Sequence, residues 1–559
     1  MERKWWHNKI AYQIYPKSFM DSNGDGIGDI KGIISKLDYF KELGIDILWL
    51  SPIYKSPLAD QGYDISDYYD IDPRFGTMDD LDDLIAKGKE LGIGIVMDLV
   101  VNHCSDEHEW FKKACEDPDG PYGKFFYIED HKEGQPLPCN WRSYFGGSCW
   151  DKLPGHDDKI YLHVFHKKQP DLNWENPLLR KEIYKMINWW LDKGIAGFRI
   201  DAIINIKKKL PFSDYPADRD DGLSSMDNML KEAVGIGEFL GEMASETFRK
   251  YDAFSVGEVF NEKDSELPLF IGENGYFSSM FDFSTTHLDE ESKTRYEEKE
   301  ITANEYRDAI FANHKRIEGI GYLSNIIENH DEPRGVSRYI KTSDLSEHSK
   351  KALAGIYFLL PGIPFIYQGQ EIGMENLKSS DIDSTDKLDD CANADIYNTA
   401  INAGLSEKDA LNVLIKHSRD NARTPFQWSS EAHAGFSTAN PWLLVNPNYK
   451  KINLEAQKKD DDSVFNFYKE LIALRKDPEY TDTFVYGKFT PMYTDMDNLI
   501  CYKRTGDKTI IIYTNYQAKE IDIKLESPIK TILLSNSKEV RFNEKELHLN
   551  GYDLVVAEV

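Results

Sequence analysis

A (β/α)8 TIM barrel, with a loop-rich subdomain inserted after its third strand and a C-terminal all-β domain, is the fold that the sequence predicts. Short apolar runs alternate with longer amphipathic stretches through most of the 559 residues. The alternation stops between residues 104 and 174, and beyond about residue 480 closely spaced short strands replace it. Repeated alternation of strands and helices is typical of a parallel barrel, so this α/β class accounts for most of the chain.

The predicted barrel strands are short runs rich in β-branched and aromatic residues. They occupy residues 11–16, 45–52, 94–101, 197–202, 254–259, 276–283, 322–331 and 364–371. Amphipathic stretches such as "MDDLDDLIAKGKELG" and "LLRKEIYKMINWWLDKG" lie between or after most of them. Both of these stretches end in glycine, as a helix C-cap does, so we predict helices there. The barrel then comprises residues 1–103 and 175–480.

Two segments depart from the repeat. Residues 104–174 are rich in Gly, Pro and aromatic residues, and they contain no long helical pattern after the first few turns. We interpret them as an inserted subdomain B over the mouth of the barrel. Residues 481–559 contain strand-like runs such as "KTIIIYTNY" and "YDLVVAEV", separated by turns. These runs predict a C-terminal β-sandwich domain.

Composition limits the classes of function. The chain is 41% apolar and 13% aromatic, as a globular protein is, and its net charge of −29 argues against nucleic-acid partners. No run approaches the ~20 apolar residues of a membrane span, and the first residues lack the apolar core of a signal peptide. Six scattered cysteines without a CxxC pair indicate no disulfide framework. We therefore expect a soluble, cytoplasmic monomer without membrane partners.

Carboxylates stand at the carboxyl ends of four predicted strands, where the active sites of barrels form. The strands end in "DLVVNH", "GFRIDA", "VGEV" and "IENHD". Arg199 and Asp201 are two residues apart and share one face of their strand, so the arginine would keep Asp201 ionised, as a nucleophile requires. Glu258 lies among valines, which would raise its pKa and keep it as an acid. One ionised and one protonated carboxyl, ~5–5.5 Å apart, is the equipment of a retaining glycosidase.

The same four motifs, in this order, resemble those of the alpha-amylase superfamily, glycoside hydrolase family thirteen. "QGYDISDY", "QPDLNWENP" and "RDNARTPFQW" are similar to motifs of its oligo-1,6-glucosidase and alpha-glucosidase group. The resemblance covers the chain from end to end. It implies that Asp201 is the nucleophile, Glu258 the acid/base and Asp331 a third carboxylate that stabilises the transition state. It also implies contacts with the same glucose from Tyr63, His103, Arg199 and His330.

The resemblance further implies an exo-acting enzyme. In the group, the residues that match Asp64 and Arg423 pair and close the pocket beyond the first sugar. Arg419 belongs to the same motif as Arg423. For Arg419, a purely structural ion pair is at least as good an interpretation as a role in closing the pocket. Phe145 and Phe165 of subdomain B are candidates for the lining of the glucose pocket, although they could instead form the core of the subdomain.

A candidate metal loop, "DSNGDGIGD", follows the first strand. Its pattern is that of an EF-hand loop, except that the twelfth position is glycine instead of a bidentate glutamate. A solvated acidic turn is the alternative interpretation. The resemblance implies a structural Ca²⁺ in this loop, since hydrolysis by two carboxylates needs no Lewis acid. The implied ligands are the side chains of Asp21, Asn23, Asp25 and Asp29 and the carbonyl of Ile27.

The implied function is that of an exo-acting retaining α-glucosidase that releases glucose from the non-reducing end of short α-glucosides. The substrates would be isomalto- and malto-oligosaccharides, with sucrose an open alternative. Ala202 follows the nucleophile, where members that accept α-1,4 linkages often have Ala and α-1,6 enzymes usually have Val.

Rival interpretations remain within and beyond this enzyme class. A sucrose isomerase or other transglucosylase is one, although "EPRGVSRYI" replaces the Arg-Leu-Asp-Arg-Asp run of isomerases. Trehalose-6-phosphate hydrolase is another, with the lysines of "NIKKKLP" as candidate phosphate contacts. A non-catalytic transporter subunit is disfavoured, because all three carboxylates are present and no membrane span is found.

Overall fold

A closed barrel of eight parallel strands forms the centre of the molecule. The structure is a computed structural model that describes residues 2–289, 299–382 and 384–559. Neighbouring strands follow the order β1-β13-β12-β11-β10-β9-β5-β2. Their bounds are β1 (Ala11–Ile14), β2 (Ile47–Leu50), β5 (Gly94–Val100), β9 (Gly197–Asp201), β10 (Phe254–Gly257), β11 (Ser279–Phe281), β12 (Leu323–Asn325) and β13 (Ile363–Tyr367). Each overlaps its predicted run, so the predicted fold class is confirmed.

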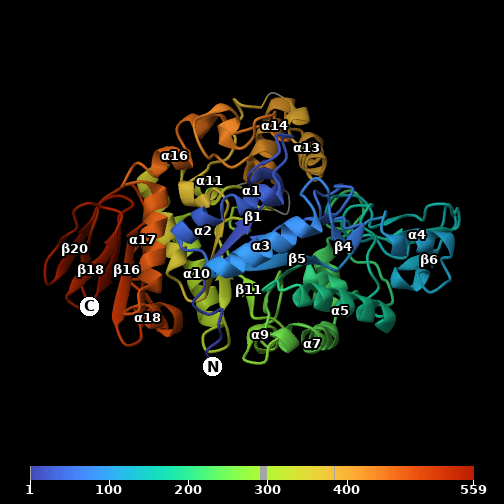
Figure 1. The fold of residues 1–559 in the computed structure, drawn as a ribbon, viewed down its shortest axis with the longest axis horizontal. Coiled ribbons are helices and arrows are strands. Elements are labelled where there is room, and N and C mark those ends of the chain that lie inside the picture. The colour runs from blue at the N-terminus through green and yellow to red at the C-terminus, as the bar shows by residue number, and fades with distance from the viewer. Residues whose placement is uncertain (1, 290–298, 383) are drawn as a thin grey trace.

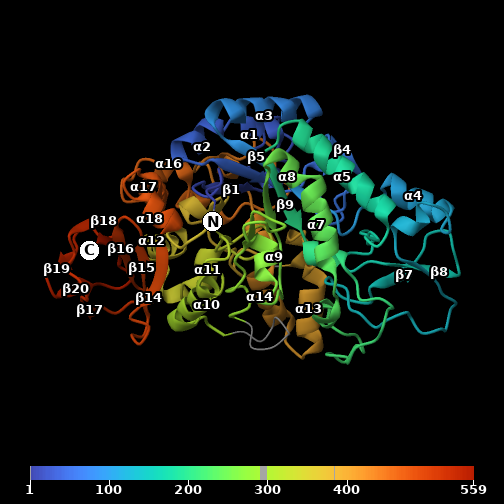
Figure 2. The same cartoon turned by 90° about the horizontal axis from the view of Figure 1, so that it is seen from below.

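Helices surround the barrel (Figures 1 and 2). They include α1 (Ile30–Ile34), α2 (Leu37–Leu43), α3 (Met78–Leu91), α5 (Pro177–Asp192), α6 (Met226–Glu232), α7 (Ile236–Glu246), α8 (Phe248–Tyr251), α9 (Leu267–Ile271), α10 (Ala303–Arg316), α11 (Gly335–Tyr339) and α12 (Glu347–Phe358). The sequence sets the ends of α3 locally. Thr77 and Asp80 form a capping box at its start, and Gly92 ends it in the left-handed conformation, with φ of 76°. None of the described helices is long and apolar enough to cross a membrane.

The insertion between β5 and β9 contains α4 (Glu109–Glu116) and a small antiparallel sheet. The order of that sheet is β6 (Ile128–Asp130), β8 (Lys159–Leu162) and β7 (Trp150–Lys152). An isolated bridge between His103 and Asp171 joins the two ends of the insertion where they meet the barrel. The insertion therefore presents its loops to the carboxyl ends of the barrel strands.

A second excursion follows β13, and the sequence analysis did not separate it from the barrel. It contains α13 (Asn393–Asn402), α14 (Glu407–His417) and α15 (Asp420–Arg423), and α13 packs against α14. The chain then returns to the barrel through α16 (Leu454–Gln457), α17 (Val464–Lys476) and α18 (Thr481–Tyr486). Helix α18 lies inside the range predicted for the β-sandwich, whose first strand begins at Lys488.

The C-terminal part is all-β beyond α18. One sheet has the order β14 (Lys488–Met492), β15 (Leu499–Thr505), β16 (Thr509–Asn515), β21 (Leu554–Glu558) and β18 (Thr531–Ser535). The other has the order β17 (Ile521–Lys524), β20 (Glu546–Leu549) and β19 (Arg541–Phe542). Figures 1 and 2 place these sheets and the insertion at opposite ends of the long axis.

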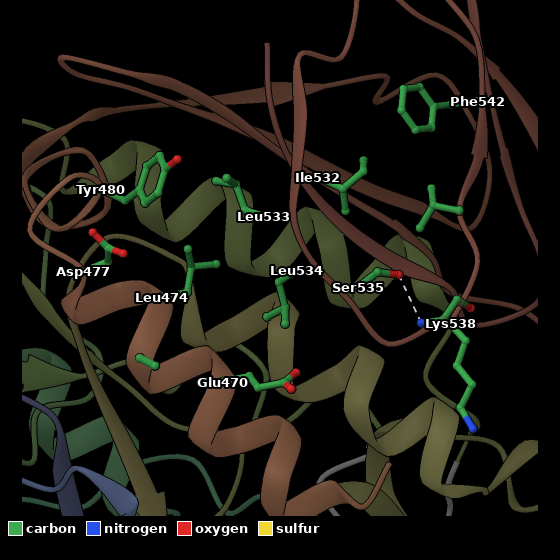
Figure 3. A pocket seen from close by; sticks show the side chains of 13 residues that line it. Glu470, Leu474, Asp477, Tyr480, Ile532, Leu533, Leu534, Ser535, Lys538 and Phe542 are labelled. Atoms are coloured by element: carbon green, nitrogen blue, oxygen red, sulfur yellow. Dashed lines mark hydrogen bonds between the residues drawn. The ribbon is translucent and has the colours of Figure 1, made fainter. Parts of the chain in front are cut away.

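A shallow pocket lies where α17 meets β18 (Figure 3). Figure 3 shows Glu470 and Leu474 on the helix side, facing Leu534 on the strand side. Neither Asp201 nor Glu258 lines this pocket.

Candidate active site

A pocket opens at the carboxyl ends of the barrel strands. Its lining comes from these ends, from the insertion, from the loop after β10 and from α13. The predicted site residues that line it are Tyr63, His103, Phe145, Phe165, Asp201, Ala202, Glu258 and Asp331. The other four predicted residues lie outside the lining and are buried, namely Asp64, Arg199, His330 and Arg423.

Arg199 connects the two predicted catalytic carboxylates. Its Nη1 lies 2.6 Å from Oδ1 of Asp201, and its Nη2 lies 3.0 Å from Oε2 of Glu258. Only 1% of the arginine is exposed, so its charge is poorly screened by solvent. Two carboxyl groups that contact one guanidinium must be close together, as a retaining pair requires.

Asp98 fixes the position of Arg199, a role that was not predicted from the sequence. Its Oδ1 accepts a hydrogen bond of 2.9 Å from Arg199, and its Oδ2 accepts one of 3.0 Å from the Tyr63 hydroxyl. Burial raises the pKa of Asp98 to about 6, while the charge of Arg199 opposes this shift. Asp98 and Asp201 thus fix the guanidinium in the orientation in which it can reach Glu258.

Burial raises the pKa of both catalytic carboxyls to about 7, against the opposing charge of Arg199. From the sequence, a raised pKa is predicted for Glu258 alone. Asp201 is also desolvated, and the neighbouring charges of Asp98 and Asp331 raise its pKa further. The pair therefore shares about one proton near neutral pH. The shorter contact of Arg199 with Asp201 favours the ionised form at Asp201 and leaves the proton to Glu258.

Ala202 connects the two carboxylates through the backbone. Its N–H donates a hydrogen bond of 2.7 Å to Oε2 of Glu258. The residue has φ of 42° and ψ of 33°, a left-handed conformation that β-branched residues rarely adopt. The turn after β9 thus places Asp201 and the bond donor to Glu258 next to each other.

Asp331 contacts two arginines and a histidine. Its Oδ1 accepts hydrogen bonds of 2.9 Å from both Arg419 and Arg423, and its Oδ2 lies 3.0 Å from Nε2 of His330. Burial raises the pKa of Asp331, but His330 and the three nearby arginines more than reverse this and hold it well below its ordinary value. Asp331 is therefore an anion throughout the physiological pH range.

Two histidines support the floor of the pocket as neutral groups. Burial lowers the pKa of His330 to about 3, and burial also lowers that of His103. The rings of His330 and Tyr63 stack with their centroids 5.3 Å apart. Nε2 of His103 lies 3.1 Å from the side-chain nitrogen of Gln169 and 3.1 Å from the carbonyl oxygen of Tyr63. His330 thus contacts the ring of Tyr63, and His103 contacts its backbone carbonyl.

The far wall of the pocket contains an ion pair, but the sequence analysis named the wrong partners. Asp64 and Arg423, both described in the structure, do not pair. Asp64 accepts hydrogen bonds from Ser56 and from the backbone N–H groups of residues 59 and 60, so it orders its own loop. Arg419 instead lies 3.2 Å from Asp60.

Arg419 is further fixed on two sides. Its guanidinium forms an ion pair with Asp390 and lies 5.3 Å from the centroid of the Phe145 ring. Asp390 and Asp60 come from segments more than three hundred residues apart, so the wall joins the excursion after β13 to the loop after β3 (Tyr54–Lys55). Asp60 and Arg419 both line the pocket.

The insertion supplies aromatic lining that was only partly predicted. Tyr144 stacks on Phe165 at 4.8 Å, and its hydroxyl lies 3.1 Å from Oδ1 of Asn205. Helix α13 completes the rim with Asp395, Ile396 and Thr399. These residues carry no motif that would distinguish them in the sequence from an ordinary surface helix.

The side chains of the candidate metal loop accept hydrogen bonds from the backbone of the same loop. Asp21 accepts hydrogen bonds from three backbone N–H groups, 2.7 to 3.0 Å long, and one of 2.5 Å from Ser437. Asn23 and Asp25 each accept one from the backbone two residues on, and Asp29 caps α1. Within the described residues, no three His, Cys, Asp or Glu side chains converge as a metal cluster. The loop thus holds its shape by Asx turns.

The model of the alpha-amylase catalytic domain matches residues 13–484. The chain belongs to the alpha-amylase family. Within the family it is similar to the probable oligo-1,6-glucosidase 3 of Bacillus subtilis (strain 168). That relative is 44% identical over 92% of this chain and 91% of its own length. The resemblance seen in the motifs is thereby confirmed, and the chain is a glycoside hydrolase of the oligo-1,6-glucosidase group.

Solved structures of other members of the alpha-amylase family superpose over the whole chain. The trehalose-6-phosphate hydrolase of Bacillus licheniformis gives a TM-score of 0.91 at 37% identity. The isomaltulose synthase of Klebsiella sp. LX3 gives a TM-score of 0.93 at 34% identity. In both cases the match covers 100% of each chain. The fold of the alpha-amylase family therefore does not by itself choose among hydrolysis, isomerisation and a phosphorylated substrate.

Proposed function

We propose that the protein is an exo-acting, retaining α-glucosidase that releases glucose from the non-reducing end of short isomalto- and malto-oligosaccharides. The observation that carries the proposal is the contact of Asp201 and Glu258 with one buried guanidinium. It provides one ionised and one protonated carboxyl at neutral pH, on neighbouring strands.

Each of these residues has its own role in the reaction. Asp201 attacks the anomeric carbon of the bound glucose while Glu258 protonates the oxygen of the leaving sugar. Water then enters, Glu258 removes its proton, and the glucosyl ester on Asp201 is hydrolysed with a second inversion. Asp331 remains anionic and accepts hydrogen bonds from the sugar hydroxyls, which strengthen as positive charge develops on the ring. Tyr63 offers its ring to the apolar face of the glucose.

The wall made by Asp60 and Arg419 supports the exo mode of action. The two side chains both line the pocket and meet at 3.2 Å. A sugar chain that continued beyond the first glucose would have to separate this ion pair. Only the non-reducing end then fits, and one glucose is released at a time.

We expect isomaltotriose to yield α-glucose and isomaltose as first products. Two successive inversions at the anomeric carbon restore its configuration, and the closed wall limits cleavage to the terminal unit. Proton NMR during the first minutes, before mutarotation, resolves both anomers. The appearance of β-glucose first would exclude the covalent mechanism, and labelled glucose as a first product from isomaltotriose labelled at its reducing end would exclude release from the non-reducing end.

The charge of the pocket disfavours a phosphorylated substrate. Its lining includes eight carboxyl side chains and three arginines. Of the arginines, Arg316 pairs with Glu262 and Asp264, and Arg419 pairs with Asp60 and Asp390. Two of the three lysines proposed as phosphate contacts are engaged elsewhere, because Lys207 pairs with Glu175 and Lys208 with Asp171. A phosphate at the mouth would therefore face predominantly negative charge.

Transglucosylation is a second candidate, favoured by one feature of the lining. Phe260 and Phe283 lie on the pocket wall with their ring centroids 5.2 Å apart. An apolar pair beside the acid/base offers a second sugar a surface on which to stack, in competition with water. A rise of oligosaccharide products with substrate concentration would reveal this route.

Ala202→Val is expected to lower kcat/KM on maltose by about tenfold or more relative to isomaltose. The side chain lies beside the bond that is cleaved. An α-1,4 leaving sugar is attached through a ring carbon and needs the room that valine's methyls would fill. Strain from the left-handed backbone affects both substrates alike, so the ratio of the two is the measurement.

Ala202→Gly is the matched control, since glycine adopts the same backbone without strain and should keep activity on both sugars. Equal losses on maltose and isomaltose in the valine variant would show that the linkage is selected elsewhere in the pocket.

We also propose that the loop of residues 21–29 binds Ca²⁺ for stability alone. Its carboxylate and amide oxygens keep lone pairs besides those used in the Asx turns, and oxygen donors suit Ca²⁺. EDTA should lower Tm and added Ca²⁺ should restore it, because the ion binds the folded state. The initial rate at low temperature should change little. A Tm that is indifferent to both additions contradicts the site, and an immediate loss of activity without unfolding contradicts the structural role.

A further inference from the structure

The reaction proposed above needs a site for the sugar that departs. The ion pair of Asp60 and Arg419 would stop the sugar chain on one side of the bound glucose. The departing sugar must lie next to Glu258, because that residue protonates its oxygen. Two segments extend from this part of the site, namely the loop after β10, which begins with Glu258, and the segment after β11. Residues of both segments line the pocket.

Helix α10 contacts both of these segments. Asn313 and Arg316 are three residues apart on the helix, and both line the pocket. Residues at this spacing lie on the same face of a helix, so the two side chains are neighbours. Arg316 contacts Glu262 in the loop after β10, whereas Asn313 contacts Asp282 in the segment after β11. Both segments are thus tied to one face of α10.

Three hydrogen bonds fix the guanidinium of Arg316. Its Nε donates to Asp264, its Nη1 donates a bond of 2.5 Å to Oε1 of Glu262, and its Nη2 donates one of 2.7 Å to the carbonyl oxygen of Glu262. A guanidinium has five N–H groups, so one N–H on each terminal nitrogen has no acceptor among the described residues. The side chain is 26% exposed and lines the pocket, so a ligand can reach it.

The loop after β10 balances the charge of this arginine. Asn261 lines the pocket with φ of 57°, in the left-handed region that asparagine adopts more readily than most residues. The next residue, Glu262, presents both its carboxylate and its carbonyl oxygen to Arg316. Glu262 and Asp264 together supply two negative charges against the one positive charge. The arginine therefore offers hydrogen-bond donors without a net positive charge around it, which suits the hydroxyls of a neutral sugar.

Asn313 adds an acceptor beside these donors. Its Nδ2 donates a hydrogen bond of 2.7 Å to Oδ1 of Asp282, a side chain that is only 5% exposed. Since an ionised carboxylate accepts and does not donate, this bond turns the amide nitrogen of Asn313 toward Asp282. The amide oxygen of Asn313 has no donor within the part of the chain that the structure describes. A sugar hydroxyl both donates and accepts, so Arg316 and Asn313 together complement two hydroxyls of one sugar ring.

On the basis of the proposed function, we propose that Arg316 and Asn313 bind the hydroxyls of the departing sugar, and that they select substrates whose leaving group is a second neutral sugar. The contacts lie away from the bond that is cleaved, so they are made in the ground state and in the transition state alike. They therefore contribute to substrate binding more than to turnover. A glucoside without a second sugar gains nothing from them.

Two substrates with the same glucosyl group and different leaving groups test this role. Isomaltose carries a second sugar, whereas α-glucosyl fluoride releases a fluoride ion and needs no second subsite. We expect Arg316→Ala to lower kcat/KM on isomaltose by about tenfold or more, and Asn313→Ala by about threefold or more, mainly through a raised KM. On α-glucosyl fluoride both variants should stay within about twofold of the wild type.

Lys315→Ala is the matched control. Lys315 lies between the two residues on α10, but it is exposed, pairs with Glu318 and does not line the pocket. Its variant should match the wild type on both substrates.

Two results overturn the role of α10. A variant of Arg316 or Asn313 that keeps the wild-type kcat/KM on isomaltose shows that its side chain does not contact the departing sugar. Equal losses on isomaltose and α-glucosyl fluoride show that the substitution disturbs the loop that carries Glu258 instead of a sugar contact. A wild type that hydrolyses neither substrate contradicts the proposed function itself, whereas hydrolysis of both with unchanged variants contradicts only the role of α10.

Discussion

Asp201→Asn is expected to lower kcat on isomaltose by about 10⁴-fold or more. An amide is a poor nucleophile, and without a glucosyl ester the remaining groups can only bind and orient the substrate. The asparagine oxygen can still accept the bond from Arg199 that Asp201 accepts at 2.6 Å. The guanidinium therefore stays paired with Asp98, and the fold should be retained. Steady-state rates, together with Tm, measure both effects.

Asp227→Asn is the matched control for this substitution. Asp227 also lines the pocket, but its side chain is exposed and accepts only a long hydrogen bond of 3.4 Å from Asn261 among the contacts of the described residues. We expect a loss below about tenfold there, because only pocket charge changes. If Asp201→Asn kept more than about a tenth of the wild-type rate, another residue would have to be the nucleophile.

The strand ends explain why the reaction centre could be predicted from sequence. Asp201 and Glu258 interrupt buried, apolar strands, and a carboxylate in such a place is costly unless it is paired or functional. Parallel strands bring their carboxyl ends to one face of the barrel, so motifs distant in the chain had to meet there. The fold class could also be predicted, because the alternation of strand-like and helical runs is itself a pattern in the sequence.

The ion pair in the wall of the pocket could not be predicted correctly from the sequence. Asp60 and Asp64 stand four residues apart in one loop, and the sequence does not tell which of them faces the pocket. In the structure the backbone N–H groups of the loop turn toward Asp64 and satisfy it, which leaves Asp60 for Arg419. The choice depends on loop conformation, which no periodic pattern encodes.

Other residues of the pocket could not be predicted either, because their roles depend on tertiary contacts. In the sequence, Asp98 lies within an apolar strand. Only the structure shows that Arg199 and Tyr63 contact it. Tyr144 and α13 reach the pocket only because the insertion and the excursion after β13 fold over the same mouth. Their residue types are those of any surface loop or helix, so the sequence offered no signal for them.

Glu258→Gln is expected to lower kcat on isomaltose by about 10²- to 10⁴-fold, the usual contribution of general acid catalysis. Glutamine can still accept the 2.7 Å bond that the N–H of Ala202 donates, so the turn after β9 should persist. The loss should depend on the leaving group. An aryl α-glucoside whose phenolate departs without a proton should still form the ester on Asp201, and the ester should accumulate because no base activates water.

Two measurements distinguish this role from a merely structural one. Intact mass spectrometry with the aryl glucoside should detect a glucosyl adduct on the variant, and azide, which needs no base, should restore turnover as α-glucosyl azide. The pH profile gives the second test. Burial raises the pKa of Glu258 to about 7, so in the wild type kcat/KM on isomaltose should fall as the pH rises through this value and the acid loses its proton. With the aryl substrate the basic limb should disappear in Glu258→Gln. Equal losses on both substrates, without an adduct, would mean that the proton donor is another group of the pocket.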